Sequence, residues 1–304
     1  WSPVSSHFLL DCGCHRCYAM FDMLSTDSLV KQTEARRGDA PVPPRIEFCN
    51  VTRRFPGKKG TAPVVAAQNV SLAIGDGEVV SLIGPSGCGK STLLNMGSGL
   101  FLPSEGEVFV NGTRVEGPNP QVAFMLQKDL LLPWRSIREN VELGLHIRGM
   151  QAAERHRRSV ALMQRFHLKG FEDHYPHQLS GGMRQRAALA RTLAVEPSVL
   201  LLDEPFSALD AQTKMVLQQD LAMTLAEEKK TTLFITHDLT EAIALSDRVL
   251  VMSKRPGTII DEITIDIPGR DNPMVRRRDA RVGSYVVRLM ELLHIDDLMA
   301  ADSI

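Results

Sequence analysis

Three features that often reveal a protein's class are missing from this 304-residue sequence. Its apolar runs, such as Val199 to Leu202, have the length of a strand and do not approach the ~18 residues that a membrane span needs. Lys and Arg number 35 against 36 Asp and Glu, which gives a formal net charge of −1. Because no overall basic field is present, nucleic acid is disfavoured as a partner.

Cysteine is also scarce, with five residues in the chain. Cys12, Cys14 and Cys17 are crowded together, and five cysteines are no disulfide framework for a chain of this size, which favours a reducing compartment. This spacing could hold a soft metal, but structural zinc sites pair two such knuckles and the sequence has one. We expect residues 1–43 to be an N-terminal extension that is disordered or not native, with translation starting at Met20 or Met23.

The strongest positive signal is a phosphate loop that fits G-x-x-x-x-G-K-[ST] at every fixed position. An apolar run at 79–83 predicts a strand before it, and residues 91–100 can form a helix after it, which is the context that this motif requires. The glycines let backbone N–H groups face a polyphosphate, Lys90 can reach the β- and γ-phosphates, and Ser91 can bind Mg²⁺. The candidate phosphate-binding residues are Gly84, Pro85, Ser86, Gly87, Cys88, Gly89, Lys90, Ser91 and Thr92.

On both sides of this loop, the spacing of apolar residues changes between the period of a strand and that of a helix. Short alternating runs between 45 and 80 and an Asn-Gly turn within 108–115 predict a small antiparallel layer. A strand at 122–126 leads to Gln127, and the period of residues 128–194 predicts an inserted helical subdomain. Near its end, Ser180 can cap a helix while Gly181 and Gly182 leave its first N–H groups open, so a second anion site is expected there.

Two further apolar strands end in polar residues. Residues 199–202 lead into Asp203 and Glu204, and residues 232–236 lead into His237. Strands that alternate with helices predict right-handed crossovers and a mostly parallel sheet, whose ligands bind outside the carboxyl ends of the strands. The predicted fold class is therefore α/β, a P-loop NTPase with a mostly parallel core, a small antiparallel layer and an inserted helical subdomain.

The predicted domain borders follow from the same pattern. We expect a nucleotide-binding domain at 44–267, with the helical subdomain at about 128–194, and a C-terminal helical tail at 268–304. The tail carries three consecutive arginines, Arg276 to Arg278, which we interpret as a solvated basic turn before a packing helix. A regulatory or lipid-contacting role is the alternative.

Six motifs occur in a fixed order: the phosphate loop, Gln127 at a strand end, Leu179 to Met183, the strand ending in Asp203-Glu204-Pro205, residues 207–210, and Thr236-His237-Asp238. Together they resemble the ABC-type ATPase family over about residues 45–265. Residues 124–149 and Tyr175 to Leu179 are similar to the nitrate/sulfonate/taurine group of bacterial importer ATPases.

The resemblance implies roles for the site residues. Gln127 and Asp203 would join Ser91 around Mg²⁺, Glu204 would polarise the attacking water, and His237 would contact the γ-phosphate of ATP. Other expected nucleotide contacts are Phe55 in place of the usual tyrosine, Asp210, and, from a second copy, Ser180, Gly181 and Gly182.

The resemblance also implies partners and a location. The working unit would be a head-to-tail homodimer that binds ATP and Mg²⁺. It would drive transport of a small anion through integral membrane permease subunits fed by a substrate-binding protein, at the cytoplasmic face of the bacterial inner membrane.

Other interpretations remain open. Taken singly, Asp203-Glu204 could be a solvated strand end, His237 a buried core histidine and Gln127 a surface amide. A soluble ABC ATPase acting on DNA or ribosomes would carry a long coiled-coil insertion or paired cassettes, and this chain has one cassette with a short helical insertion. A non-catalytic nucleotide-binding regulator would be expected to lose Glu204 or Lys90, and both are present.

Overall fold

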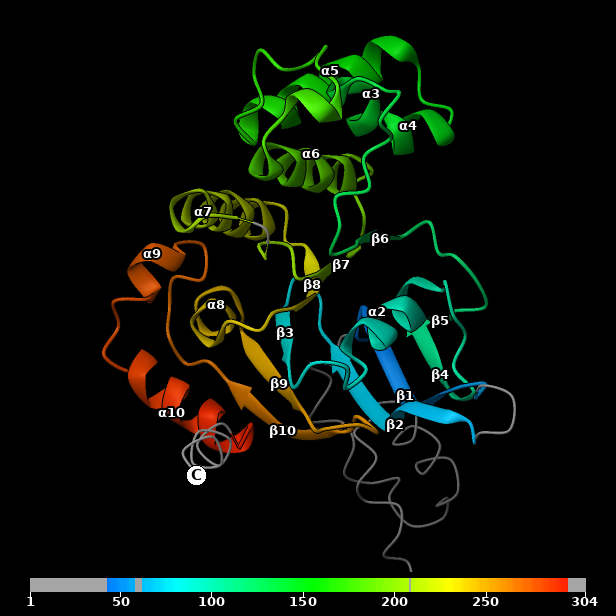
Figure 1. Cartoon of the computed structure of the whole chain (residues 1–304), viewed down its shortest axis with the longest axis vertical. Helices are drawn as coiled ribbons and strands as arrows, with labels where there is room; N and C mark the ends of the chain where they lie inside the picture. The colour runs from blue at the N-terminus through cyan, green and yellow to red at the C-terminus, as the bar shows by residue number, and fades with distance from the viewer. Residues whose placement is uncertain (1–42, 58–61, 208, 295–304) are drawn as a thin grey trace, which may run out of the picture.

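A computed structural model describes residues 43–57, 62–207 and 209–294. The expectations for residues 1–42, including Cys12, Cys14 and Cys17, and for residues 295–304 lie outside this part. Figure 1 shows a group of helices above two sheets, with further helices along one side.

The central sheet has six strands in the order β10-β9-β3-β8-β7-β6. The pairs from β9 to β6 are parallel, and only the edge strand β10 runs antiparallel to β9. The predicted mostly parallel core is confirmed, but β10 was not predicted. The strands are β3 (Val79–Ile83), β6 (Val122–Met125), β7 (Val199–Asp203), β8 (Thr231–Ile235), β9 (Arg248–Met252) and β10 (Ile259–Thr264).

The central strands are buried on both faces, as their continuous apolar runs predict. Successive side chains point to opposite faces, so Leu200 and Leu202 pack in one hydrophobic cluster with the helices α6 (Gly181–Ala194) and α7 (Ala211–Glu227). Leu201 packs in a second cluster with α2 (Lys90–Ser98) and the other sheet. The sheet is therefore the middle layer of the molecule.

The second sheet is the predicted antiparallel layer, with the order β2-β1-β4-β5. Its Asn111-Gly112 turn has φ of 49° and 72°, the left-handed pair that a type I′ hairpin requires. Helix α2 contacts strands of both sheets and fills the space between them. The strands are β1 (Ile46–Phe55), β2 (Val64–Ile74), β4 (Glu105–Val110) and β5 (Thr113–Arg114).

Four helices between β6 and β7 form the group at the top of Figure 1. Residues 137–147 form two short helices that meet at Glu142. Ser136 begins the first of them with a capping box, in which its hydroxyl accepts from Glu139 N while the Glu139 carboxylate accepts from Ser136 N. The members are α3 (Ile137–Val141), α4 (Leu143–Ile147), α5 (Ala152–Arg165) and α6.

The C-terminal part covers the side of the central sheet near β9 and β10. Helix α10 (Val282–Leu292) packs against α8 (Leu239–Leu245) in a third apolar cluster, preceded by the short α9 (Pro273–Arg276). The interpretation of Arg276 as part of a solvated turn is wrong, because this side chain is 2% exposed. Its guanidinium donates to the carbonyls of Ala244, Ser246 and Ile265, which together offset the cost of burying it.

Candidate nucleotide site

The phosphate loop lies at the end of β3 and leads directly into α2, in the predicted strand–loop–helix order. At Gly89 the backbone has φ of 112°, and an added Cβ would lie 2.6 Å from Ala66 O. A Cβ at Gly84 would lie 2.7 Å from Met252 O. Only glycine fits such close approaches, so β2 and the end of β9 fix the outer wall of the loop.

The Lys90 and Cys88 side chains differ in their surroundings, although Lys90 Nζ lies 3.8 Å from Cys88 Sγ. The Lys90 ammonium donates to Gly84 O at 2.8 Å and Pro85 O at 2.9 Å across the loop. Cys88 is 1% exposed, and its side chain packs in the apolar cluster between the sheets. Because the Cys88 side chain is enclosed, Cys88 can contact a phosphate through its backbone. The Lys90 ammonium can reach a ligand that is bound within the loop.

Asp203 ends β7 beside the first turn of α2. Its carboxylate is 7% exposed and accepts a hydrogen bond from the Ser91 hydroxyl. Burial raises the pKa of Asp203 above the ordinary range, against the opposing effects of Ser91 and Lys90. The site therefore holds a poorly solvated carboxylate that a cation would stabilise in its charged form.

Glu204 brings three predicted residues together. Its Oε2 accepts from Gln127 Nε2 at 3.0 Å and lies 3.4 Å from His237 Nδ1. Glu204 has φ of 47°, a left-handed conformation that is uncommon for residues other than glycine, and its N–H donates to Ile235 O at the end of β8. The ends of β6, β7 and β8 thus present an amide, a carboxylate and an imidazole at one point.

Comparison with known proteins agrees with this geometry. A family model described as ABC transporter matches residues 67–207. An uncharacterized ABC transporter ATP-binding protein of Methanocaldococcus jannaschii is 46% identical over 204 residues, which are 67% of this chain and 76% of that protein. The chain belongs to the ABC transporter family. It is an ATP-binding ATPase subunit of that family.

Two relatives of this ABC ATPase carry importer names. The nitrate import ATP-binding protein NrtD of Synechocystis is 44% identical, over 74% of this chain and 84% of that protein. The taurine import ATP-binding protein TauB of Yersinia pestis is 43% identical, over 67% and 80%. These matches confirm the predicted resemblance to the nitrate and taurine importer group.

A solved ATP-binding cassette has the same fold. The dimeric structure of its post-hydrolysis state, bound to ADP and Pi, superposes with a TM-score of 0.66 at 34% identity. It covers 72% of this chain and 98% of that chain. The match confirms the predicted fold class of this ABC ATPase.

The second group of predicted contacts lies apart from the phosphate loop. Ser180 is exposed at the start of α6, where its hydroxyl accepts from Met183 N at 3.3 Å. Gly182 lies against the start of α7, since a Cβ there would meet Thr213 and Leu209 at 3.2 and 3.3 Å. Among the contacts of the described residues, none joins Ser180, Gly181 or Gly182 to Lys90 or Glu204.

Asp210 and Phe55 have contacts of their own. Asp210 caps α7 by accepting from Thr213 N, and this hydrogen bond lowers the pKa of its carboxyl. The half-buried Phe55 ring ends β1, with the Arg53 guanidinium 4.9 Å from its centroid and the Phe101 ring edge-on at 6.0 Å. A cation over one side and an apolar neighbour hold the ring in place as a stacking surface.

Arg255 is a neighbour of the site that sequence reasoning did not find. It lies between β9 and β10, and its Nε and Nη2 donate to the carbonyl of Gly87 in the phosphate loop at 2.9 and 2.6 Å. This contact turns the Gly87 carbonyl toward Arg255. A lone arginine 168 positions from its partner has no spacing signal that could have revealed it.

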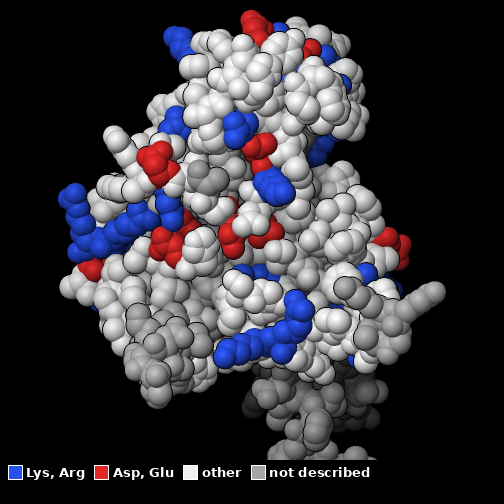
Figure 2. Space-filling view, viewed as in Figure 1, with Lys and Arg blue, Asp and Glu red and all other residues white. Residues whose placement is uncertain are grey.

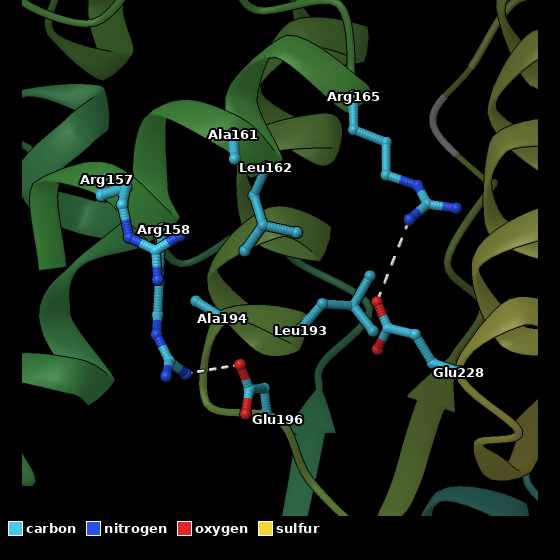
Figure 3. A pocket seen from close by; sticks show the side chains of 9 residues that line it. All are labelled: Arg157, Arg158, Ala161, Leu162, Arg165, Leu193, Ala194, Glu196 and Glu228. Atoms are coloured by element: carbon cyan, nitrogen blue, oxygen red, sulfur yellow. Dashed lines mark hydrogen bonds and ion pairs between the residues drawn. The ribbon is translucent and has the colours of Figure 1, made fainter. Parts of the chain in front are cut away.

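Other hollows of the surface do not repeat this chemistry. The groove in Figure 3 lies between α5, α6 and the end of α7, and its arginines are paired with acids, Arg158 with Glu196 and Arg165 with Glu228. Over the face in Figure 2, positive and negative side chains of the described residues are interspersed. Within the described ranges, no helix is long and apolar enough to cross a bilayer.

Proposed function

We propose that this chain is the ATP-hydrolysing subunit of an importer for a small anion of the nitrate, sulfonate or taurine kind, and that it works with Mg²⁺ as a head-to-tail dimer. The observation that carries the catalytic part is the Gln127–Glu204–His237 cluster next to the Ser91–Asp203 contact. The relatives named for nitrate and taurine import support the substrate class.

The oxygen atoms around Ser91 suit Mg²⁺. Magnesium bound to substrate phosphates keeps several waters and takes one or two protein oxygens, so it needs no cage of acids. The described residues contain no cluster of three or more His, Cys, Asp or Glu. We assign Ser91 Oγ, the Asp203 carboxylate and the Gln127 amide oxygen as its protein neighbours. When bound, the ion would offset the negative charge of the phosphates.

Each side chain then has a defined task in hydrolysis. The N–H groups of the phosphate loop and the Lys90 ammonium bind the β- and γ-phosphates and offset their charge. The Glu204 carboxylate accepts a hydrogen bond from the attacking water and orients it in line with the γ-phosphorus. His237, which is 66% exposed and lies 3.4 Å from Glu204 Oε2, contacts the transferred phosphoryl group.

A second copy would complete the site. Ser180 and the N–H groups of Gly181 and Gly182 open a helix of 14 residues, whose positive dipole end favours phosphate. Because no contact among the described residues joins them to Lys90 or Glu204 of the same chain, we assign them to the ATP of the partner copy. The solved cassette, 34% identical, is a dimer bound to ADP and Pi, which supports a dimeric working unit.

The helical group offers a surface for the membrane subunits. Trp134 and Ile147 are 72% and 77% exposed, and a hollow beside them is lined by Trp134, Arg135, Arg138 and His146 among others. Large exposed apolar side chains rimmed by charge are typical of protein contacts. We place the permease subunits here, which implies a peripheral location at the cytoplasmic face of the membrane and a separate substrate-binding protein.

Glu204→Gln tests the catalytic part of the proposal. This change keeps the shape and the nucleotide contacts but removes the charge that polarises water, so phosphate release should fall by ~10²–10⁴. ATP should then accumulate between two copies, and the variant should elute as a dimer on size exclusion with MgATP and as a monomer without it. Undiminished hydrolysis in Glu204→Gln would contradict the assignment of Glu204.

A further inference from the structure

Two residues that flank His237 are held by a single buried polar cluster. Glu241 of α8 is 3% exposed, and its Oε2 accepts from the Thr236 hydroxyl. Thr236 Oγ1 in turn accepts from Asp238 N at 3.0 Å, and Asp238 Oδ1 accepts from Glu241 N at 3.1 Å. His237 lies between these two anchored neighbours.

His237 has few contacts of its own. Its side chain is 66% exposed, and its Nδ1 lies 3.4 Å from Glu204 Oε2. The position of the imidazole therefore depends on the backbone that Thr236 and Asp238 hold. Any change in the Glu241 cluster should reach His237 through that backbone.

The cluster extends to the C-terminal segment. The Gln218 side chain of α7 is fully buried, and its Nε2 donates to Glu241 Oε1 at 2.5 Å. Its Oε1 accepts from Arg277 Nη2, at the end of α9, also at 2.5 Å. Because an amide has one acceptor end and one donor end, Arg277 fixes the orientation in which Gln218 can donate to Glu241.

Lys214 is the cation that contacts the two acids of the cluster. Glu241 and Asp238 carry two negative charges, and Lys214 lies 3.1 Å from Glu241 and 2.8 Å from Asp238. Lys214 alone can neutralise one of the two. Arg277 contributes a hydrogen bond to the neutral Gln218 amide and, within the described part of the chain, makes no ion pair with these acids. Burial raises the pKa of Glu241, as expected for a carboxylate with little solvent.

We infer that Gln218 and Arg277 are positioning residues for His237, which act through Glu241 and connect the C-terminal segment to the nucleotide site. This inference rests on the proposed role of His237 at the γ-phosphate. It also assigns a task to one arginine of the basic run, whose neighbour Arg276 is used in packing.

The test compares Arg277→Met with Arg278→Met, since Arg278 is the adjacent, exposed arginine and the charge change is identical. Loss of one hydrogen bond of the relay should lower kcat of ATP hydrolysis about three- to tenfold, with KM for ATP within about twofold. Arg278→Met should match the parent. Equal kcat values in Arg277→Met and Arg278→Met would overturn the inference.

Gln218→Met, which is similar in volume, breaks the same relay in the middle. If Arg277 acts through Gln218, the double variant Gln218→Met/Arg277→Met should lose no more kcat than Gln218→Met alone. Losses that multiply would show independent action and would overturn the relay. Melting curves of all variants identify any loss that comes from unfolding.

Hydrogen exchange gives a readout that needs no hydrolysis. Without nucleotide, the amides of Asp238 and Glu241 should exchange faster in Arg277→Met than in the parent, and at the parent rate in Arg278→Met. Unchanged exchange in Arg277→Met would overturn the inference even if the chain hydrolyses ATP. A parent protein that does not hydrolyse ATP would instead refute the proposed function, while the exchange comparison still decides on the relay.

Discussion

The two halves of the proposed nucleotide site are held in different ways. Around the phosphate loop, Lys90 and Asp203 are buried, and Glu204 is hydrogen bonded within the same chain. At the start of α6, Ser180 is exposed, and its hydroxyl makes only a local contact with Met183 N. The residues of the first half contact one another within one chain, whereas those of the second half present their hydrogen-bond donors to solvent. This difference is what a site shared between two copies requires.

The largest effect should follow from blocking the exposed half. Ser180→Phe puts a ring where we expect the phosphate of the partner copy, so turnover should fall about 10²-fold through misplacement of the reacting groups. Affinity of the separate subunit for ATP should stay within about twofold, because the phosphate loop is untouched. Fluorescent-nucleotide titration and phosphate release measure the two quantities.

Ser284→Phe is the matched control, since Ser284 is an exposed serine near the start of α10 and remote from α6. It should leave turnover unchanged. If Ser180→Phe is also without effect, the shared site is refuted.

Mixing two variants that are each inactive tests whether two copies share a site. A pair formed by Ser180→Phe and Lys90→Ala has one site with an intact phosphate loop and an intact Ser180. In an equimolar mixture, half of the dimers should contain one copy of each variant, and each of these dimers has one intact site out of two. About a quarter of the parent activity should therefore return. Titration of one variant into the other should show a maximum near equal amounts. Activity that stays at the level of the single variants at every ratio would argue against exchange of sites between copies.

A smaller effect is expected from changing Arg255, which contacts the phosphate-loop half of the site. Arg255→Ala removes the donors to the Gly87 carbonyl, so the loop is less well arranged for phosphate before ATP arrives. KM for ATP should rise about three- to tenfold with kcat nearly unchanged. Arg288→Ala, which removes an exposed arginine paired with Asp261, is the control for charge. A fall in kcat at constant KM would contradict this role for Arg255.

The smallest effect concerns stability. Burial raises the pKa of Asp203 in the folded state, so this group favours folding below its unfolded pKa, and the advantage is lost as pH rises through the folded pKa. At neutral pH the charged, poorly solvated carboxylate is a cost. Asp203→Asn should therefore raise the melting temperature of the nucleotide-free protein by on the order of one to a few degrees at pH 7.

The gain in Asp203→Asn should shrink as the pH is lowered toward the raised pKa of Asp203, because the carboxyl takes up a proton there. Calorimetry at several pH values measures the trend. A gain that is the same at pH 4 and pH 7 would show that burial of the charge is not its cause.

Sequence reasoning succeeded where the pattern is local. Val79–Ile83 is a strand with the predicted ends, and the Asn111-Gly112 turn has the predicted conformation, because apolar runs and left-handed turns are encoded by adjacent residues. The carboxyl ends of the parallel strands likewise bring Gln127, Glu204 and His237 together, as the topology implies.

Contacts between distant loops could not be predicted in this way. Arg255 reaches Gly87 from 168 positions away, and Arg277 reaches Gln218 from 59 positions away, and neither belongs to a periodic segment. Strand β10 was missed because Ile263 is its one buried residue and the charged Asp261 and Glu262 interrupt its apolar run. The direction of the Cys88 side chain depends on packing between two sheets, which no local pattern specifies.

The backbone of Glu204 has a consequence for how this position can change over time. A left-handed φ of 47° costs a residue with a long side chain about 1–3 kcal/mol, while native domains have only about 5–15 kcal/mol of net stability. Glycine would relieve this strain, and asparagine tolerates the conformation better than glutamate does. If stability alone were selected, glutamate at position 204 should therefore be replaced by another residue over time. A glutamate retained there would record selection for turnover, at a position where folding by itself prefers another residue.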